Sequence, residues 1–165
     1  GSARWKAFRW NPRQHSTITV NDAEHDALGD ARIIEVSRED AAMGGTVDLT
    51  KTLNGEVRSA VRQAIIKDEE YLQLKDVIVA QADKDANVRW CFPTEAEVRV
   101  VAEGLELTRG DVTVLLSAIT DCPVEYGIWA NDPEKADFPS AFCAFEEKRE
   151  TVVSKSASQP LRHVK

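Results

Sequence analysis

The stretch GEVRSAVRQAIIK, residues 55–67, opens the part of the chain that decides the fold prediction. Its apolar residues recur at steps of three and four: Val57, Ala60, Val61, Ala64 and Ile65. Such spacing places apolar side chains on one face of a helix. The sequence therefore predicts a helix from about residue 54. A second helix, or a kinked continuation of the first, then runs to about residue 82.

A second pair of helices is predicted between residues 94 and 120. Thr94 and Glu97 match a capping box, in which each side chain bonds a free backbone N–H of the first turn. The apolar residues that follow keep a helical spacing on both sides of Gly110: Val98, Val101, Ala102, Leu105, Val112, Leu115, Leu116 and Ile119. This pattern indicates a helix-turn-helix-like unit. Arg109 is the one cation at the start of its second helix, so a DNA reader and a plain helical hairpin both remain open.

Short β-branched segments predict strands at residues 16–20, 31–37, 46–50, 88–92 and 124–129. Residues 38–45 are expected to form a short helical turn, and residues 139–146 a final helix. Most of the strands fall in the first third of the chain and most of the helices follow residue 54. We therefore expect an α+β fold, with a small antiparallel sheet packed against three to five helices.

Length and composition indicate a single soluble domain. With 165 residues, 42% hydrophobic and 30% charged, the chain has enough apolar content for a core. We place the globular domain at residues 14–150, between an arm at 1–13 and a flexible basic tail at 151–165. The leading Gly1-Ser2 is typical of a cloning remnant, so the domain is expected to belong to a larger protein. No apolar run approaches the ~20 residues that span a bilayer.

The three cysteines, Cys91, Cys122 and Cys143, are widely spaced and odd in number. This usage fits a reducing compartment, so we expect an intracellular protein, cytoplasmic or nuclear, with buried free thiols.

The charge is distributed unevenly. The net charge is −7, from 21 bases and 28 acids. Four bases and no acid lie in residues 1–20, and three bases and no acid lie in residues 151–165. The remaining 14 bases face all 28 acids in residues 21–150, a balance of −14. An acidic body repels phosphates, so only the basic ends are suited to nucleic acid.

The arm combines cations with aromatic rings: Arg4, Trp5, Lys6, Phe8, Arg9 and Trp10. Flat rings can stack on bases while cations contact phosphates, which is the composition of a single-strand contact. Trp and Arg are equally common anchors of protein interfaces, and an edge strand would also fit. These six residues and Arg109 are the candidate contacts with a partner or nucleic acid.

No motif in the sequence predicts a catalytic, cofactor or metal site. Asp83, Asp85 and Asn87 match the first positions of a calcium loop. The loop then lacks its glycine, replaced by Val88, and its final glutamate, replaced by Thr94. His25 lies among acids but lacks the further ligands that zinc requires. Phosphate-loop and nucleophile motifs are missing as well.

These observations favour a non-enzymatic interaction domain that binds another protein or self-associates. The alternative is a nucleic-acid-binding domain that uses the arm and the 94–120 unit. A third hypothesis is an enzyme whose site is assembled from dispersed acids such as Asp22, Asp26 or Asp83. It requires at least two of these carboxylates to line one pocket.

Overall fold

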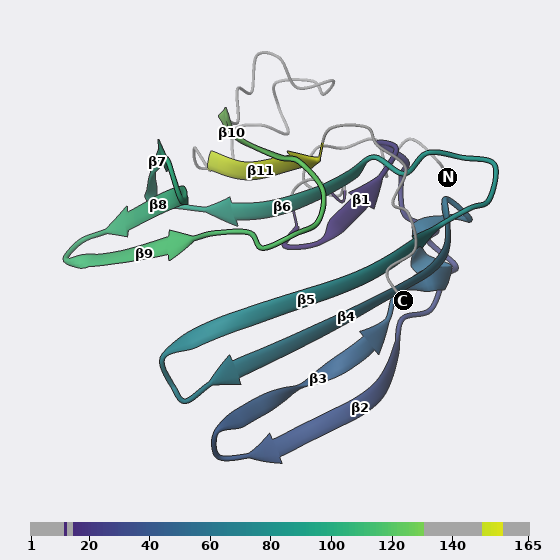
Figure 1. The fold of residues 1–165 in the computed structure, drawn as a ribbon, viewed down its shortest axis with the longest axis horizontal. Coiled ribbons are helices and arrows are strands. Elements are labelled where there is room, and N and C mark those ends of the chain that lie inside the picture. The colour runs from purple at the N-terminus through teal and green to yellow at the C-terminus, as the bar shows by residue number, and fades with distance from the viewer. Residues whose placement is uncertain (1–11, 13–14, 131–149, 157–165) are drawn as a thin grey trace, which may run out of the picture. The chain divides into compact units, whose positions relative to one another are not determined.

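The computed structural model describes residue 12, residues 15–130 and residues 150–156; for 129–130 and 150–156 only the backbone is described. Almost every element in this part of the chain is a β-strand (Figure 1). The strands are β1 (Ile18–Val20), β2 (Arg32–Glu39), β3 (Ala42–Asp48), β4 (Val57–Lys67), β5 (Tyr71–Ala80), β6 (Val88–Thr94), β7 (Glu97–Val101), β8 (Gly104–Arg109), β9 (Val112–Leu116), β10 (Val124–Ala130) and β11 (Glu150–Ser156). Within residues 15–130 and 150–156, the single helical element is a 3₁₀ turn, η4 (Thr50–Leu53).

The predicted α+β fold is therefore wrong. The strands form three antiparallel sheets, which we call sheets A, B and C, with orders β1-β6-β11-β10, β2-β3-β4-β5 and β7-β8-β9. The described residues divide into two compact units, one within residues 12–22 and 87–156 and the other at residues 23–86. Sheets A and C belong to the first unit, and sheet B belongs to the second.

Sheet B replaces the helices predicted between residues 54 and 82. Strands β4 and β5 form a long hairpin, and the polar residues 68–70 that interrupt the apolar pattern are its turn. Asp68 and Glu69 both have positive φ there, at 50° and 58°. Apolar steps of four also fit a strand, because an even step returns to the same face. The steps of three join residues on opposite faces of β4.

Sheet C replaces the predicted helix-turn-helix unit. Strands β7, β8 and β9 form a meander in which Leu107 pairs with both Val98 and Val114. Thr94 accepts a hydrogen bond from the amide of Ala96 at 3.0 Å, within a turn between two strands and not at a helix start. Gly110 forms the β8–β9 turn with a φ of 58°.

The predicted strands at 16–20, 31–37, 46–50, 88–92 and 124–129 correspond to β1, β2, β3, β6 and β10. The helical turn expected at 38–45 is wrong, because residues 42–48 form β3 and pair with β2. The final helix expected at 139–146 lies outside the described residues. Strand β11 includes residues 151–156, the first six residues of the tail that the sequence predicted to be flexible.

Buried apolar side chains stabilise each unit. In the first unit the buried residues are Ile18, Val20, Val88, Cys91 and Leu105. Those in the second unit are Leu53, Val57, Ala60, Ile65 and Ala86. Each fully buried aliphatic side chain contributes about 1.5–3 kcal/mol relative to an exposed one. The buried set in the second unit gathers mainly at η4 and the start of β4, so much of β2, β3 and β5 remains open to solvent.

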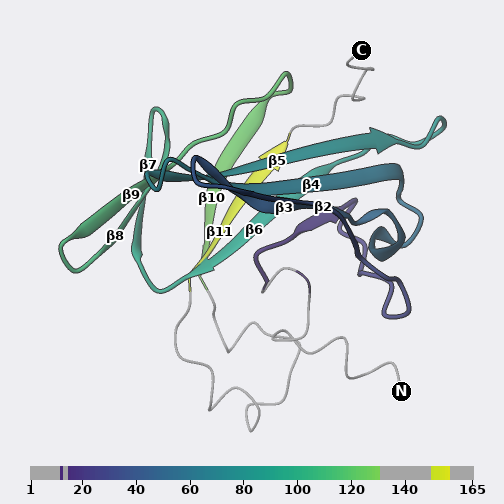
Figure 2. The same ribbon diagram turned by 90° about the horizontal axis from the view of Figure 1, so that it is seen from below.

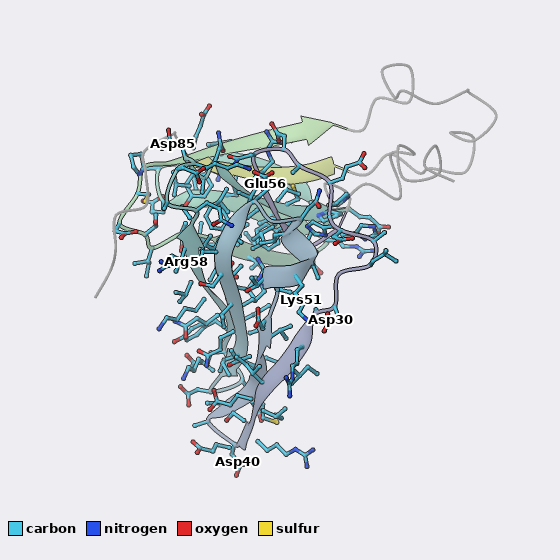
Figure 3. The ribbon with its side chains drawn as sticks, turned by 90° about the vertical axis from the view of Figure 1, so that its right-hand side faces the viewer. Asp30, Asp40, Lys51, Glu56, Arg58 and Asp85 are labelled. Carbon is cyan, nitrogen blue, oxygen red and sulfur yellow. The ribbon has the colours of Figure 1, made fainter. Side chains whose placement is uncertain are left out.

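Sheet B is a continuous four-stranded meander. The β2–β3 and β4–β5 turns lie at the same end of it (Figure 1), and the four strands appear as a narrow band when seen nearly edge-on (Figure 2). Asp40 marks the turn end, while Lys51 and Glu56 lie toward the opposite end, where η4 enters the sheet (Figure 3). The sheet therefore has two long faces, and these carry the candidate sites.

Candidate functional site

The register of sheet B defines two chemically different faces, because cross-strand partners point to the same side of a sheet. One face, here called the apolar face, holds three rows of partners: Ile33–Val47–Arg62–Asp76, Val36–Gly45–Ala64–Leu74 and Arg38–Met43–Ile66–Leu72. The other, here called the polar face, holds Glu35–Thr46–Gln63–Lys75, Ser37–Gly44–Ile65–Gln73 and Glu39–Ala42–Lys67–Tyr71.

The apolar face exposes large side chains to solvent. Ile33 is 67% exposed, Val36 58%, Met43 47%, Ile66 47% and Leu72 61%. Single exposed apolar residues are ordinary, whereas a contiguous group of them marks a surface that another molecule or domain covers. Since these five side chains share three adjacent rows of one face, they form such a contiguous group.

An ion pair lies at the end of the apolar face that is away from the hairpin turns. Arg62 of β4 donates to both carboxylate oxygens of Asp76 of β5, with N–O distances of 2.8 and 2.9 Å. Their side chains are only 13% and 6% exposed. The two residues are register partners, so the fork of the guanidinium lies directly over the neighbouring strand. This nearly buried pair fixes the register of β4 against β5.

The polar face carries a hydrogen-bonded row. The Thr46 hydroxyl donates to Glu35 at 3.4 Å and accepts from the Gln63 amide at 3.4 Å. Thr46 is 8% exposed and Ile65 is 5% exposed, whereas Met43 and Ile66 on the opposite side of the same two strands are each 47% exposed. The centre of the polar face is thus more enclosed than the apolar face on the opposite side of the same strands.

Gly44 keeps the middle of the polar face flat. A Cβ at this position would lie 1.9 Å from the carbonyl oxygen of Ala64 in the neighbouring strand. Only glycine lets the two backbones approach this closely. At the turn end of the same face, the Tyr71 side chain is 54% exposed. Among the described residues, its hydroxyl and the side chains of Gln73 and Lys75 make no hydrogen bond or ion pair.

The predicted partner-contact residues are only partly described. Arg4, Trp5, Lys6, Phe8, Arg9 and Trp10 lie outside the described residues, so their role stays a prediction. Arg109 ends β8, and its exposed side chain pairs with Glu95 at 3.0 Å. It stands on a strand of sheet C and not at the start of a recognition helix. Nucleic-acid binding through a helix-turn-helix is therefore wrong.

Two of the three dispersed acids, Asp22 and Asp26, make structural contacts. Asp22 pairs with Arg89 at 2.5 Å in the first unit. Asp26 accepts a hydrogen bond from the amide of Leu28 at 2.9 Å, which closes a loop turn. Near Asp83 and Asp85, Lys84 pairs with Glu56 at 3.7 Å. Among residue 12 and the ranges 15–130 and 150–156, no three acids, histidines or cysteines cluster as metal ligands.

Among the described side chains of sheet A, two buried polar atoms lack hydrogen-bond partners. They are the Thr19 hydroxyl and the Arg89 Nε, on cross-strand neighbours of β1 and β6. Thr19 is 1% exposed. Ordered water commonly satisfies such groups, so this pair by itself does not define a ligand site.

Local contacts shift two pKa values. Hydrogen bonds from Thr50, including one from its amide at 2.9 Å, lower the pKa of Asp48 below 3.8. Burial raises the pKa of the Cys122 thiol, and the neighbouring Asp121 carboxylate adds to the effect. Cys91 is fully buried. The hydrogen bonds to Asp48 stabilise a turn. The raised pKa makes Cys122 a weak nucleophile, since the thiolate is the reactive form.

Sequence analysis missed the polar face. The helix prediction placed Gln63 and Lys75 on two successive helices or on one kinked helix, although they are register partners on neighbouring strands. Alternation in Tyr71-Leu72-Gln73-Leu74-Lys75 is the signal that could have revealed it, because polar and apolar residues there exchange at every step.

The fold and its faces define a class: an all-β domain of three antiparallel sheets, of which sheet B has an open apolar face. The model of the heparinase II/III-like C-terminal domain family matches residues 1–156. The chain belongs to this family. The family name also supports the prediction that the chain is one domain of a larger protein. No curated protein matches the sequence, and no helix among the described residues is long and apolar enough to cross a membrane.

Proposed function

We propose that this chain is a domain of a carbohydrate-active enzyme and that another part of the same enzyme covers its apolar face. Membership of the heparinase II/III-like family supports the carbohydrate assignment. One observation carries the docking role: Ile33, Val36, Met43, Ile66 and Leu72 are exposed together on one face of sheet B. Covering such a group stabilises the covered state by about 25 cal/mol for each Å² of apolar surface removed from water.

The docking role is tested by Ile66→Asp, which places a charge between Met43 and Leu72 on the apolar face. In the isolated chain Ile66 is already 47% exposed, so the variant lowers the free energy of unfolding by less than about 1 kcal/mol. In the whole enzyme the charge is buried without a partner, and the loss rises to about 3 kcal/mol or more. Calorimetric or denaturant unfolding of both forms gives the two values.

Leu28→Asp is the matched control. Leu28 is 95% exposed and lies in a loop outside sheet B. Its replacement therefore introduces the same charge at a position that is not on the apolar face. We expect a small effect in the isolated chain and in the whole enzyme alike. If Ile66→Asp is no more harmful in the whole enzyme than in the isolated chain, the docking role is wrong.

The carbohydrate assignment has its own test. The whole enzyme should shorten an acidic polysaccharide such as heparin, which size-exclusion chromatography of the polysaccharide detects directly. Activity on no acidic polysaccharide would contradict the assignment and leave the docking result intact.

Self-association is a second candidate, favoured by strand β9. This edge strand of sheet C, Val112–Leu116, contains neither a charge nor a proline, the usual protection of an exposed edge. Val112 is 63% exposed and Val114 is 56% exposed. Two copies paired antiparallel about Val114 would oppose Val112 with Leu116, so only apolar or hydroxyl side chains would meet.

Analytical ultracentrifugation tests this candidate. A dimer should dissociate on dilution and should be lost in Val114→Lys, because a lysine on an edge strand opposes pairing. A monomer at all concentrations would exclude pairing through β9.

A further inference from the structure

We infer that Asn54 is a site of spontaneous deamidation, in which the backbone nitrogen of Gly55 attacks the Asn54 side chain and converts it to aspartate or isoaspartate. The site lies in the link between η4 and β4, and Glu56, the residue that follows it, is labelled in Figure 3. The inference is independent of the proposed function, because the reaction needs only water and this chain.

The reaction consumes water and releases ammonia. Hydroxide removes the proton of the Gly55 amide, and the nitrogen then forms a bond to Cγ of Asn54. The side-chain nitrogen takes a proton from water, which restores the hydroxide, and leaves as ammonia. Water then opens the resulting five-membered imide. Attack at Cγ gives aspartate, whereas attack at the backbone carbonyl carbon gives isoaspartate, in which the main chain passes through Cγ.

The first argument is that both reacting groups are accessible. Asn54 and Gly55 are exposed, and no atom lies within 4 Å of the position of a Cβ on Gly55. Among the residues that the structure describes, the Asn54 side chain and the Gly55 N–H make no hydrogen bond. No contact therefore has to break before rotation about the bonds of Asn54 brings the nitrogen to Cγ.

The second argument is that the turn itself requires this pair of residues. Asn54 and Gly55 both have positive φ, at 51° and 73°. Glycine adopts this conformation freely, and asparagine is one of the few other residues that adopt it. The same two residue types favour the reaction, since asparagine provides the amide and glycine lacks the Cβ that obstructs the attacking nitrogen. The geometry of the turn and its chemical lability thus have one cause.

The third argument is a comparison with Asn21 and Asn87, the other asparagines within residues 15–130. The Asn21 side chain accepts a hydrogen bond from the Asn87 amide at 2.9 Å, and the Asn21 amide donates to the Asn87 carbonyl at 2.8 Å. Asp22 and Val88, the residues that follow them, each carry a Cβ, and Val88 is 1% exposed. Both asparagines should therefore react more slowly than Asn54.

Deamidation alters a junction that is held by three hydrogen bonds. The Glu56 amide donates to the Leu53 carbonyl at 3.0 Å, across the reacting bond. The Gln81 side chain donates to the carbonyls of Gly55 and Val57 at 3.1 and 3.0 Å. Leu53 and Val57 are core residues, each 3% exposed. The additional main-chain atom of isoaspartate displaces these bonds, and the new charge lies two residues from Glu56, so the product should be less stable.

The experiment incubates the 165-residue chain at physiological temperature, at neutral and at mildly alkaline pH. Mass spectrometry of proteolytic peptides detects the conversion, and an isoaspartate-specific methyltransferase measures the isoaspartate. Asn54 should convert at least about tenfold faster than Asn21 or Asn87, because its nucleophile is accessible. The rate should rise with pH, since hydroxide removes the amide proton. Ion-exchange chromatography then separates the modified chain, whose melting temperature should be lower by about 2–4 °C.

Gly55→Ala should slow the conversion at least about tenfold, because its Cβ obstructs the attack even though the substitution strains the turn. Gly110→Ala is the matched control. Gly110 also has a positive φ, 58°, and no atom within 4 Å of an added Cβ, but arginine precedes it. It should leave the rate at Asn54 unchanged. Asn54→Asp introduces the charge without the additional main-chain atom, so it should lower the melting temperature less than isoaspartate does.

The same chain unfolded in urea shows what the fold contributes. If Asn54 converts in urea but stays intact in the folded chain, the fold protects the bond and the inference is wrong. Equal rates at Asn54, Asn21 and Asn87 in the folded chain, or an unchanged rate in Gly55→Ala, would also overturn it. An unchanged melting temperature of the modified chain would contradict the effect on the junction between η4 and β4.

Discussion

At the scale of single residues, Gly44 illustrates a constraint that the sequence conceals. GlyGly at 44–45 indicates a turn when it is read from the sequence alone, yet both residues lie inside β3. Gly44 is required because the carbonyl of Ala64 occupies the position of its Cβ. Local sequence cannot show this, since the contact joins residues twenty positions apart.

Gly44→Ala should therefore be strongly destabilising. Forcing β3 and β4 apart disrupts ladder hydrogen bonds, so we expect a loss of about 2–4 kcal/mol in the free energy of unfolding. Gly55→Ala is the control, because no atom lies within 4 Å of its added Cβ and only its φ of 73° is strained. That strain costs about 1 kcal/mol. Urea denaturation compares the two, and equal losses would contradict the steric account.

Asp48 should give a measurable pH dependence. Its folded pKa is lowered chiefly by the Thr50 hydrogen bonds, so the ionised form stabilises the folded state. This stabilisation is fully present above the unfolded pKa near 3.8 and is lost as the pH falls through the folded pKa. Asp48→Asn should remove it. The Asp48 side chain is only partly buried and solvent screens it, so the difference amounts to about a few tenths of a kcal/mol near pH 6.

Urea denaturation of wild type and Asp48→Asn at several pH values checks this prediction. The two free energies of unfolding should converge as the pH falls below 3.8. A difference that is constant across the pH range would mean that the carboxylate charge plays no part.

At the scale of elements, the strands that the sequence predicted are short segments with β-branched or aromatic residues and no helical apolar pattern. They correspond to β1, β2, β3, β6 and β10. The hairpin of β4 and β5 was predicted as helix because apolar residues occupy both faces of β4. Val61 and Ile65 lie on one side and Ala60 and Ala64 on the other. Apolar residues on both faces erase the alternation that identifies a half-buried strand.

The Arg62–Asp76 pair should hold the β4–β5 hairpin in register. Removing one partner leaves a charge that is nearly buried, so Asp76→Ala should cost about 3 kcal/mol or more. The double variant Arg62→Leu, Asp76→Leu should recover most of this loss, because two apolar side chains suit the neighbours Val47 and Leu74. A double-mutant cycle measured by urea denaturation gives the coupling. Losses that simply add would show that the pair is not coupled.

At the scale of the whole molecule, the candidate sites could not be predicted because a face exists only after the strands are paired. Glu35, Thr46, Gln63 and Lys75 are spread over forty residues of sequence, yet form one row across sheet B. The pairing depends on turns at Asp40 and Asp68, which the helix prediction did not contain. The expectation of a domain within a larger protein depended only on composition and chain features, and the family membership supports it.

The central claim is that the apolar face of sheet B is covered within the larger enzyme. Met43 tests it most directly, because it lies on this face, is 47% exposed and is the single methionine of the chain. Exposed methionine is oxidised by mild peroxide to the sulfoxide, which mass spectrometry detects. Tyr71, on the opposite face, is an internal control through its reaction with iodine.

The claim predicts that Met43 oxidises readily in the isolated chain and at least about tenfold more slowly in the whole enzyme, as expected for a site opened only by a minor conformation. Tyr71 should react at similar rates in both forms. Oxidation of Met43 at the same rate in the isolated chain and in the whole enzyme would contradict the claim.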